Sequence, residues 1–154
     1  MEAQEIIDIA IIDDDKLFAH AMKANIENYF SSEKIRIKLY EIGELFFENL
    51  EINVPHIVLL DINLDSKYHD AVSGMTILEK IGESGANTNV IMVTSEIKTS
   101  TAIKAFRFGA KDFVVKNENV YQQVNENLDR IRPTLFKKEK FNLRQLLAKT
   151  ANLF

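Results

Sequence analysis

Four acidic residues stand directly after two apolar runs. Asp13, Asp14 and Asp15 follow the first run, and Asp61 follows the second. An apolar run of this length between polar stretches predicts a buried strand. Acids at the ends of two such strands can converge at one edge of a sheet, where like charges repel unless a cation or a proton neutralises them. The spacing therefore predicts a divalent-metal site, in which one acid could also react.

The elements that must position these acids alternate between strands and helices. Apolar patterning predicts strands near residues 6–12, 34–40, 56–61, 89–94 and 112–116. Each strand is followed by a stretch of helical character, over 16–30, 41–50, 73–83, 98–109 and 118–131. Five alternations of strand and helix predict a parallel sheet covered by helices on both faces.

The predicted strands differ in how many of their faces are apolar. Most are apolar on both sides of the pleat, including residues 113–115, as is typical of internal parallel strands. In the second strand, Ile35, Ile37 and Leu39 alternate with basic residues. One face of this strand should meet solvent, so we expect it at an edge of the sheet.

Polar residues also follow the fourth and fifth predicted strands. Thr94 ends the fourth strand and Lys116 ends the fifth. In open α/β sheets, ligands bind beyond the carboxyl ends of the strands. Asp13, Asp14 and Asp61 therefore join Thr94 and Lys116 in one candidate site.

Composition limits the class of protein. A chain of 154 residues that is 46% hydrophobic is long enough for one domain with a sizeable core. It contains no cysteine, which excludes thiolate chemistry and fits a reducing compartment. The sequence lacks the pattern of a signal peptide or a membrane span, so we expect a cytoplasmic protein with no membrane partner.

Charge divides the chain into two parts. Residues 1–131 contain 13 basic and 22 acidic residues, whereas residues 132–154 contain six basic residues and one acidic residue. We expect a domain over 1–131, followed by a basic extension over 132–154. The acidic domain makes nucleic acid an unlikely partner, although the basic extension leaves that option open.

The sequence resembles the receiver domain of two-component response regulators. The resemblance rests on four segments that occur in this order: IAIIDDD, IVLLDINL, VIMVTSE and AFRFGAKDFVVK. The resemblance covers about residues 6–131. It implies a doubly wound, five-stranded parallel sheet of the flavodoxin-like type, in the order 2-1-3-4-5. It also implies transfer of a phosphoryl group from a phosphohistidine donor to an aspartate.

The resemblance gives the acids separate roles. Asp61 would be the nucleophile that becomes a mixed anhydride. Asp13 and Asp14 would bind Mg²⁺ together with Asp61 and the backbone carbonyl of Asn63, an all-oxygen set that suits this ion. Asp15 could be a further ligand, but we interpret it as a helix-start residue, because an acid there favours the positive end of the helix.

The resemblance also assigns the other polar residues. Lys116 would pair with the nucleophile and then with a phosphoryl oxygen, and Thr94 would donate its hydroxyl to another oxygen. Thr94 and Phe113 would form a switch, unless Phe113 is simply a core residue. Asn63 and Glu96 would tune hydrolysis of the phosphoaspartate, in a combination that resembles chemotaxis-type regulators.

Two features depart from the family pattern. Lys116 is followed by Asn117, where the family usually has a proline with a cis peptide bond. A non-proline cis bond costs about 2.5–4 kcal/mol, so we expect a trans bond here. The loop between Leu64 and Gly74 is also longer than usual, and it could gate the site, select a partner or be a tolerated insertion.

The extension contains a second amphipathic pattern. Leu143, Leu146, Leu147, Thr150 and Phe154 share one face of a predicted helix. We favour docking of this face on the domain or on a second copy of the chain, as a homodimer. A linker to an output domain and a segment that contacts nucleic acid stay open as alternatives.

Together with these patterns, the resemblance implies a stand-alone response regulator receiver. It would accept a phosphoryl group from a histidine kinase or a histidine phosphotransfer protein and signal to an effector through the fourth helix, fifth strand and fifth helix. It would catalyse its own phosphotransfer and dephosphorylation rather than act as a turnover enzyme. The alternatives are a pseudo-receiver that works without phosphorylation and a metal-dependent phosphohydrolase, for which the chain lacks a cap.

Overall fold

Five parallel strands form one sheet in the order β2-β1-β3-β4-β5. The computed structural model describes residues 5–64, 72–136 and 147–151. The strands are β1 (Ile7–Ile12), β2 (Ile35–Tyr40), β3 (Ile57–Leu60), β4 (Asn89–Thr94) and β5 (Asp112–Val115). The flavodoxin-like, doubly wound sheet implied by the resemblance is therefore confirmed.

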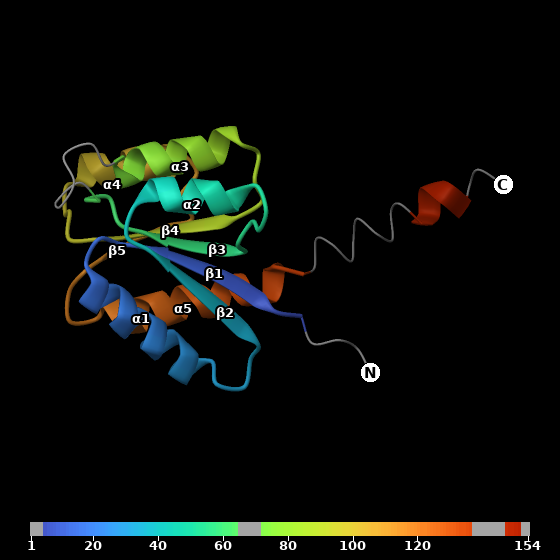
Figure 1. Cartoon of the computed structure of the whole chain (residues 1–154), viewed down its shortest axis with the longest axis horizontal. Coiled ribbons are helices and arrows are strands. Elements are labelled where there is room, and N and C mark those ends of the chain that lie inside the picture. The colour runs from blue at the N-terminus through green and yellow to red at the C-terminus, as the bar shows by residue number, and fades with distance from the viewer. Residues whose placement is uncertain (1–4, 65–71, 137–146, 152–154) are drawn as a thin grey trace.

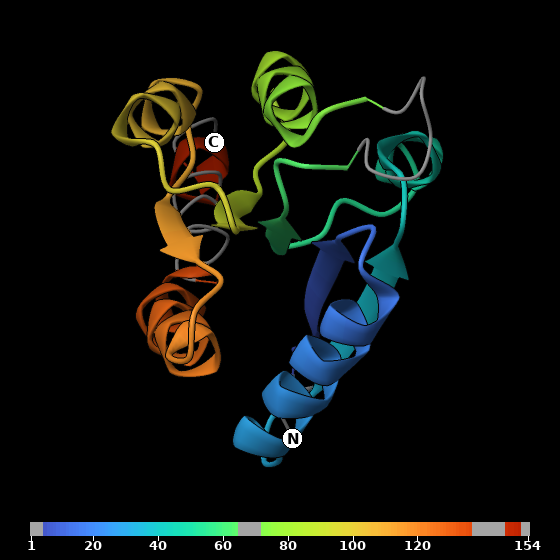
Figure 2. The same cartoon turned by 90° about the vertical axis from the view of Figure 1, so that its left-hand side faces the viewer.

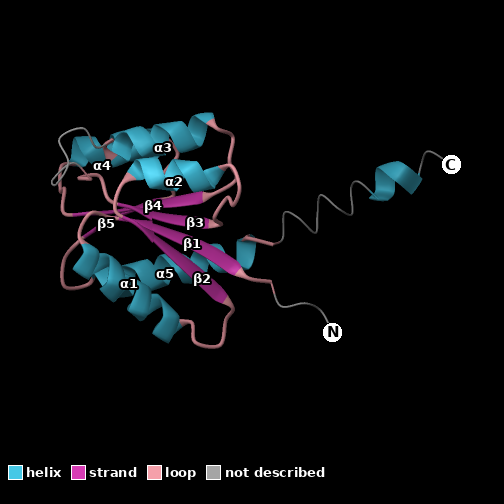
Figure 3. Ribbon diagram, viewed as in Figure 1, coloured by secondary structure: helices cyan, strands magenta, loops and turns pink. Residues whose placement is uncertain are grey.

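Helices cover both faces of this sheet, as the alternating pattern predicts. The helices are α1 (Lys16–Tyr29), α2 (Gly43–Leu50), α3 (Gly74–Glu83), α4 (Thr99–Arg107) and α5 (Val120–Ile131), followed by the short 3-10 helix η1 (Arg132–Thr134). Helices α1 and α5 lie on one face, and α2, α3 and α4 lie on the other (Figure 1). In Figure 2, which is turned by 90° from Figure 1, the sheet again lies between these two groups of helices. Figure 3 distinguishes the layers of helices and strands by colour.

The two layers of helices explain why the internal strands are apolar on both sides. In β1, Ile9 and Ile11 pack with α1 and α5, whereas Ala10 and Ile12 belong to the core beneath α2, α3 and α4. All four residues of β3 are buried. Each buried aliphatic side chain contributes about 1.5–3 kcal/mol, so the strands that carry the acids are held from both faces.

Strands β2 and β5 form the two edges of the sheet, and only the position of β2 follows from its own apolar pattern. Strand β2 lies at an edge, with Arg36 and Lys38 exposed and Ile37 buried, as its alternation predicts. Strand β5 lies at the other edge, so its interpretation as an internal strand is wrong, although the family order places it correctly. Its side chains are apolar because α4 and α5 contact it from opposite faces, even though one backbone edge has no neighbouring strand.

The helix boundaries follow local capping. Asp15 is the N-cap of α1, and its side chain accepts a hydrogen bond from the Phe18 backbone N–H at 3.1 Å. Its predicted role at the helix start is therefore confirmed. Helix α3 begins after Ser73, whose hydroxyl accepts a bond from the Thr76 N–H.

The extension contains a helix within its described part. Residues 147–151 are helical and exposed, and Leu147 is 58% exposed. Docking of this face on the domain or on a second copy of the chain stays a prediction. Leu143, Leu146 and Phe154, and most of the loop after Leu64, lie outside the described residues. None of the described helices has both the length and the apolar character needed to cross a membrane.

Candidate functional site

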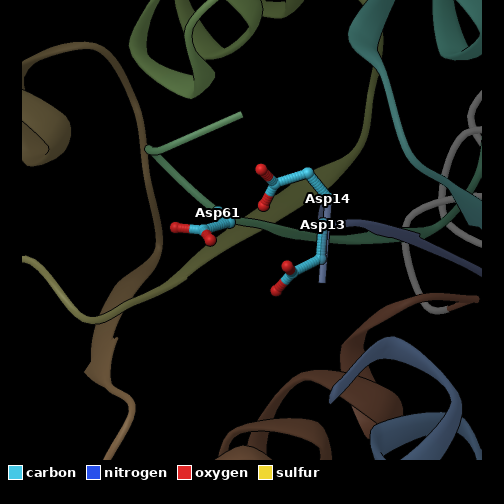
Figure 4. A group of neighbouring side chains, drawn as sticks. All are labelled: Asp13, Asp14 and Asp61. Carbon is cyan, nitrogen blue, oxygen red and sulfur yellow. The ribbon is translucent and has the colours of Figure 1, made fainter. Parts of the chain in front are cut away.

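The three predicted site acids lie together at the carboxyl ends of β1 and β3. Ile12 pairs with Leu60 in the sheet, so Asp13 and Asp61 come next on neighbouring strands. One carboxylate oxygen from each of Asp13, Asp14 and Asp61 lies within 4.8 Å of the other two. The three side chains reach into one region from two strand ends (Figure 4). All three residues are at least nine-tenths buried.

Burial disfavours negative charge on this cluster of acids. Burial raises the pKa of Asp13 to about 6, and the nearby charge of Asp61 adds to this shift. A hydrogen bond and attraction from Lys116, and a bond from the Asp15 N–H at 2.8 Å, oppose the shift without cancelling it. A buried carboxylate such as Asp13, which resists ionisation beside two further acids, fits a divalent cation, because a cation offsets the negative charge.

Lys116 contacts two of the acids. Its Nζ lies 2.8 Å from Asp13 Oδ2 and 3.0 Å from Asp61 Oδ2. Burial alone would lower the pKa of Lys116, but hydrogen bonding and attraction from the two acids outweigh it and raise the pKa. The predicted pairing with Asp61 is therefore present, and the contact with Asp13 is an addition. Lys116 remains a cation at this site.

The backbone around Lys116 keeps the lysine in reach. Its N–H donates to the Thr94 carbonyl at 2.8 Å, which continues the β4–β5 ladder past Val115. The described residues contain no cis peptide bond, so the bond to Asn117 is trans, as predicted. The departure from the family pattern at Asn117 therefore does not remove Lys116 from the acids.

Thr94 lies fully buried at the carboxyl end of β4, the strand next to β3. Its hydroxyl oxygen accepts a hydrogen bond from the Glu96 N–H at 3.2 Å. An accepting hydroxyl keeps its own proton for another acceptor. Glu96 is half-buried, and its carboxylate accepts a bond from the Lys98 N–H before α4 begins.

Asn63 contacts the candidate nucleophile, whereas Phe113 packs against the core. Asn63 is exposed, and its N–H donates to Asp61 Oδ1 at 3.2 Å, which orients the candidate nucleophile. Phe113 is half-buried on β5 and packs against the core beneath α2, α3 and α4. A core role accounts for that contact, and its role in a switch stays a prediction.

Two residues that contact the site carry no clear sequence signal. A Cβ on Gly74 would lie 1.9 Å from the Asp61 carbonyl oxygen, so α3 begins in direct contact with this strand end. A glycine at a helix start, where it is a poor helix former, is the only hint. The centroid of the Phe18 ring lies 4.3 Å from Lys116 Nζ, a contact that depends on how α1 packs beside α5.

The arrangement suits a multiply charged anion. It combines a carboxylate cluster that can hold a cation, a fixed ammonium group and a buried hydroxyl. An anion with several oxygens could be bound by the cation, the ammonium group and the hydroxyl at once, next to the Asp61 carboxylate.

Comparison with known proteins gives a consistent result. A family model described as the response regulator receiver domain matches residues 9–126. The chain is 27% identical over 96 residues to the luminescence regulatory protein LuxO of Vibrio campbellii, which covers 62% of this chain and 20% of LuxO. It is 29% identical over 92 residues to the chemotaxis protein CheY of Bacillus subtilis, which covers 58% of this chain and 72% of CheY.

A solved structure shares the fold. The signal receiver domain of a LuxO repressor protein from Vibrio parahaemolyticus superimposes with a TM-score of 0.75 at 20% identity, over 89% of this chain and 98% of that one. The chain spans about a fifth of the length of the LuxO proteins that it matches. The similarity therefore concerns one domain of those relatives.

Proposed function

We propose that this chain, which belongs to the response regulator receiver family, accepts a phosphoryl group on Asp61 in a Mg²⁺-dependent reaction. The observation that carries the proposal is the 3.0 Å contact between Asp61 and Lys116 beside two further buried acids. The donor would be a phosphohistidine on a histidine kinase or a histidine phosphotransfer protein.

The acid cluster provides the ligands for Mg²⁺. Asp13, Asp14 and Asp61 would hold the ion, together with the backbone carbonyl of Asn63. Mg²⁺ prefers oxygen ligands and usually keeps several bound waters, so a site made of a few carboxylates suits it better than it suits softer metals. When bound, the ion offsets the negative charge of the acids and of the incoming phosphoryl oxygens.

The residues of the chain then carry the transfer. An oxygen of the ionised Asp61 carboxylate attacks phosphorus and forms a new O–P bond. The P–N bond to the donor histidine breaks, and its electron pair leaves with the imidazole. Lys116 moves from Asp61 to a phosphoryl oxygen, and the Thr94 hydroxyl donates to another. The product is a mixed anhydride on Asp61.

The output would be a protein–protein interaction. When the phosphoryl group binds the Thr94 hydroxyl, it would shift the preferred position of the Phe113 side chain. That shift would change the conformation of the surface formed by α4, β5 and α5. On α4, Ile103 and Phe106 are each 49% exposed and offer apolar contacts to an effector. Asn63 and Glu96 would set how fast the phosphoaspartate hydrolyses, so the chain would act as a signal with a lifetime rather than as a turnover enzyme.

The test is direct labelling. The purified chain is incubated with Mg²⁺ and acetyl phosphate, and intact-protein mass spectrometry is followed by peptide mapping. We expect a single adduct on Asp61 that is stable in acid and labile in base. The Asp61→Asn variant should not be labelled, and chelation of Mg²⁺ should abolish labelling of the wild type.

The matched control is Asp15→Asn. Asparagine caps helices as well as aspartate does, so this variant should keep α1 intact and remain labelled. A wild type that takes no phosphoryl group in Mg²⁺ would favour a pseudo-receiver instead. Labelling that survives Asp61→Asn would remove Asp61 as the acceptor.

A further inference from the structure

We propose that Phe18 is a positioning residue that holds the Lys116 ammonium between Asp13 and Asp61. This inference rests on the proposed function for the role of Lys116, but the contact itself is independent of it. The Phe18 ring centroid lies 4.3 Å from Lys116 Nζ. This distance is well inside the roughly 6 Å within which a ring face attracts a cation.

The ring has little freedom to move away. Phe18 lies in the first turn of α1, and its N–H donates to the Asp15 N-cap. Its ring stacks on Tyr121 of α5, with centroids 6.3 Å apart and planes 23° apart. It also packs against the core beneath α1 and α5. The ring is therefore held between two helices and is aimed at the lysine.

Lys116 needs a third support because its side chain is long and flexible. Two of its donor directions point at Asp13 and Asp61, and its side chain is only 17% exposed. An ammonium on a four-carbon stem loses rotamer freedom when it is held in one place. An aromatic face attracts the charge without a fixed direction and without competing for the acids. It can therefore keep hold of the ammonium as Lys116 moves toward a phosphoryl oxygen.

Phe18 acts through Lys116, so the test must separate the ring face from ordinary packing. Phe18→Leu fills much of the same apolar space but removes the face, whereas Phe18→Tyr keeps it. Phe18→Met is a second variant without a ring, should leucine impair folding. Phe30→Leu is the matched control, because Phe30 is buried in the same core but packs beside Ile7, at the opposite end of β1.

Two measurements are made on each full-length variant, well below its melting temperature. The first is the NMR shift of the Lys116 ε-methylene protons, which a ring face moves upfield. The second is the rate of Asp61 labelling by acetyl phosphate in Mg²⁺. We expect Phe18→Leu to lose the upfield shift and to be labelled about threefold to tenfold more slowly, as the usual strength of a cation–π contact implies. Phe18→Tyr and Phe30→Leu should match the wild type in both.

The results distinguish this inference from the proposed function. An unchanged Lys116 shift in Phe18→Leu, or a labelling rate as slow in Phe18→Tyr or Phe30→Leu as in Phe18→Leu, would overturn the role of Phe18. A wild type that takes no label would overturn the proposed function alone, since the Lys116 shift still reports the contact with Phe18.

Discussion

The two ends of β1 each present an aspartate paired with a basic side chain, but the two pairs differ in their access to water. Asp8, near the start of the strand, pairs with Arg36 across the β1–β2 edge, with 28% and 56% of these side chains exposed. Asp13, just after the end, pairs with Lys116, with 3% and 17% exposed. An exposed pair is screened and contributes little, whereas a buried pair depends on its partner. Burial, more than residue type, therefore distinguishes the two ends of the strand.

The largest expected difference comes from removing the basic partner at each end. Lys116→Met leaves buried acids without their cation, and we expect it to lower the free energy of unfolding by about 3 kcal/mol in Mg²⁺-free buffer at pH 7. Arg36→Met removes an exposed partner and should cost less than about 1 kcal/mol. Urea denaturation of both variants makes the measurement. Equal losses would contradict the comparison.

The next effect is the pH dependence of stability that Asp13 causes. Its pKa is raised to about 6 in the folded protein, so the folded state holds the proton more tightly than the unfolded chain does. In Mg²⁺-free buffer, this contribution to stability is present at low pH and is lost as pH rises from about 4 through 6, at up to roughly 2–3 kcal/mol. Asp13→Asn should remove that dependence and be more stable than the wild type at pH 7.

Mg²⁺ provides the control for this prediction. A cation competes with the proton for Asp13, so Mg²⁺ should raise the melting temperature of the wild type more at pH 7 than at pH 5. Thermal unfolding with and without the ion, in parallel with Asp13→Asn, makes the measurement. A stabilisation by Mg²⁺ that is the same at both pH values would argue against a protonated Asp13.

A smaller effect is expected where α3 meets the carboxyl end of β3. Gly74→Ala would force the Asp61 backbone away from the new methyl group, and we expect a loss of about 2 kcal/mol with slower labelling of Asp61. The control is Gly82→Ala in the same helix, where the added Cβ meets only an ordinary contact at 3.5 Å. That change should stabilise the helix by up to about 1 kcal/mol. Equal labelling rates in the two variants would show that Asp61 tolerates a shift of its backbone.

The smallest effect concerns the exposed pair itself. A double-mutant cycle with Asp8→Asn and Arg36→Met should give a coupling below about 1 kcal/mol that declines as salt is added. The same cycle built from Asp13→Asn and Lys116→Met should give a larger coupling that depends less on salt. A salt-insensitive Asp8–Arg36 pair would remove the contrast between the two ends of β1.

Much of the fold follows from local patterns. The apolar runs before Asp13 and Asp61 form strands because both of their faces are buried, and the acids stand where the chain leaves the core. Asp15 caps α1 because its side chain reaches a backbone N–H three residues later, which is a property of local geometry. The residues of β5 predict the strand correctly but not its place at an edge, because helices on both faces make an edge strand as apolar as an internal one.

The sequence by itself determined which residues stand at the strand ends, since that depends on the order of polar and apolar residues along the chain. Only the tertiary structure decided which of them meet. The bridge from Lys116 to both Asp13 and Asp61, the Phe18 ring above that lysine and the contact of Gly74 with the Asp61 carbonyl each join segments distant in sequence. Such contacts depend on how strands and helices pack against one another, and no local pattern encodes the distance between them.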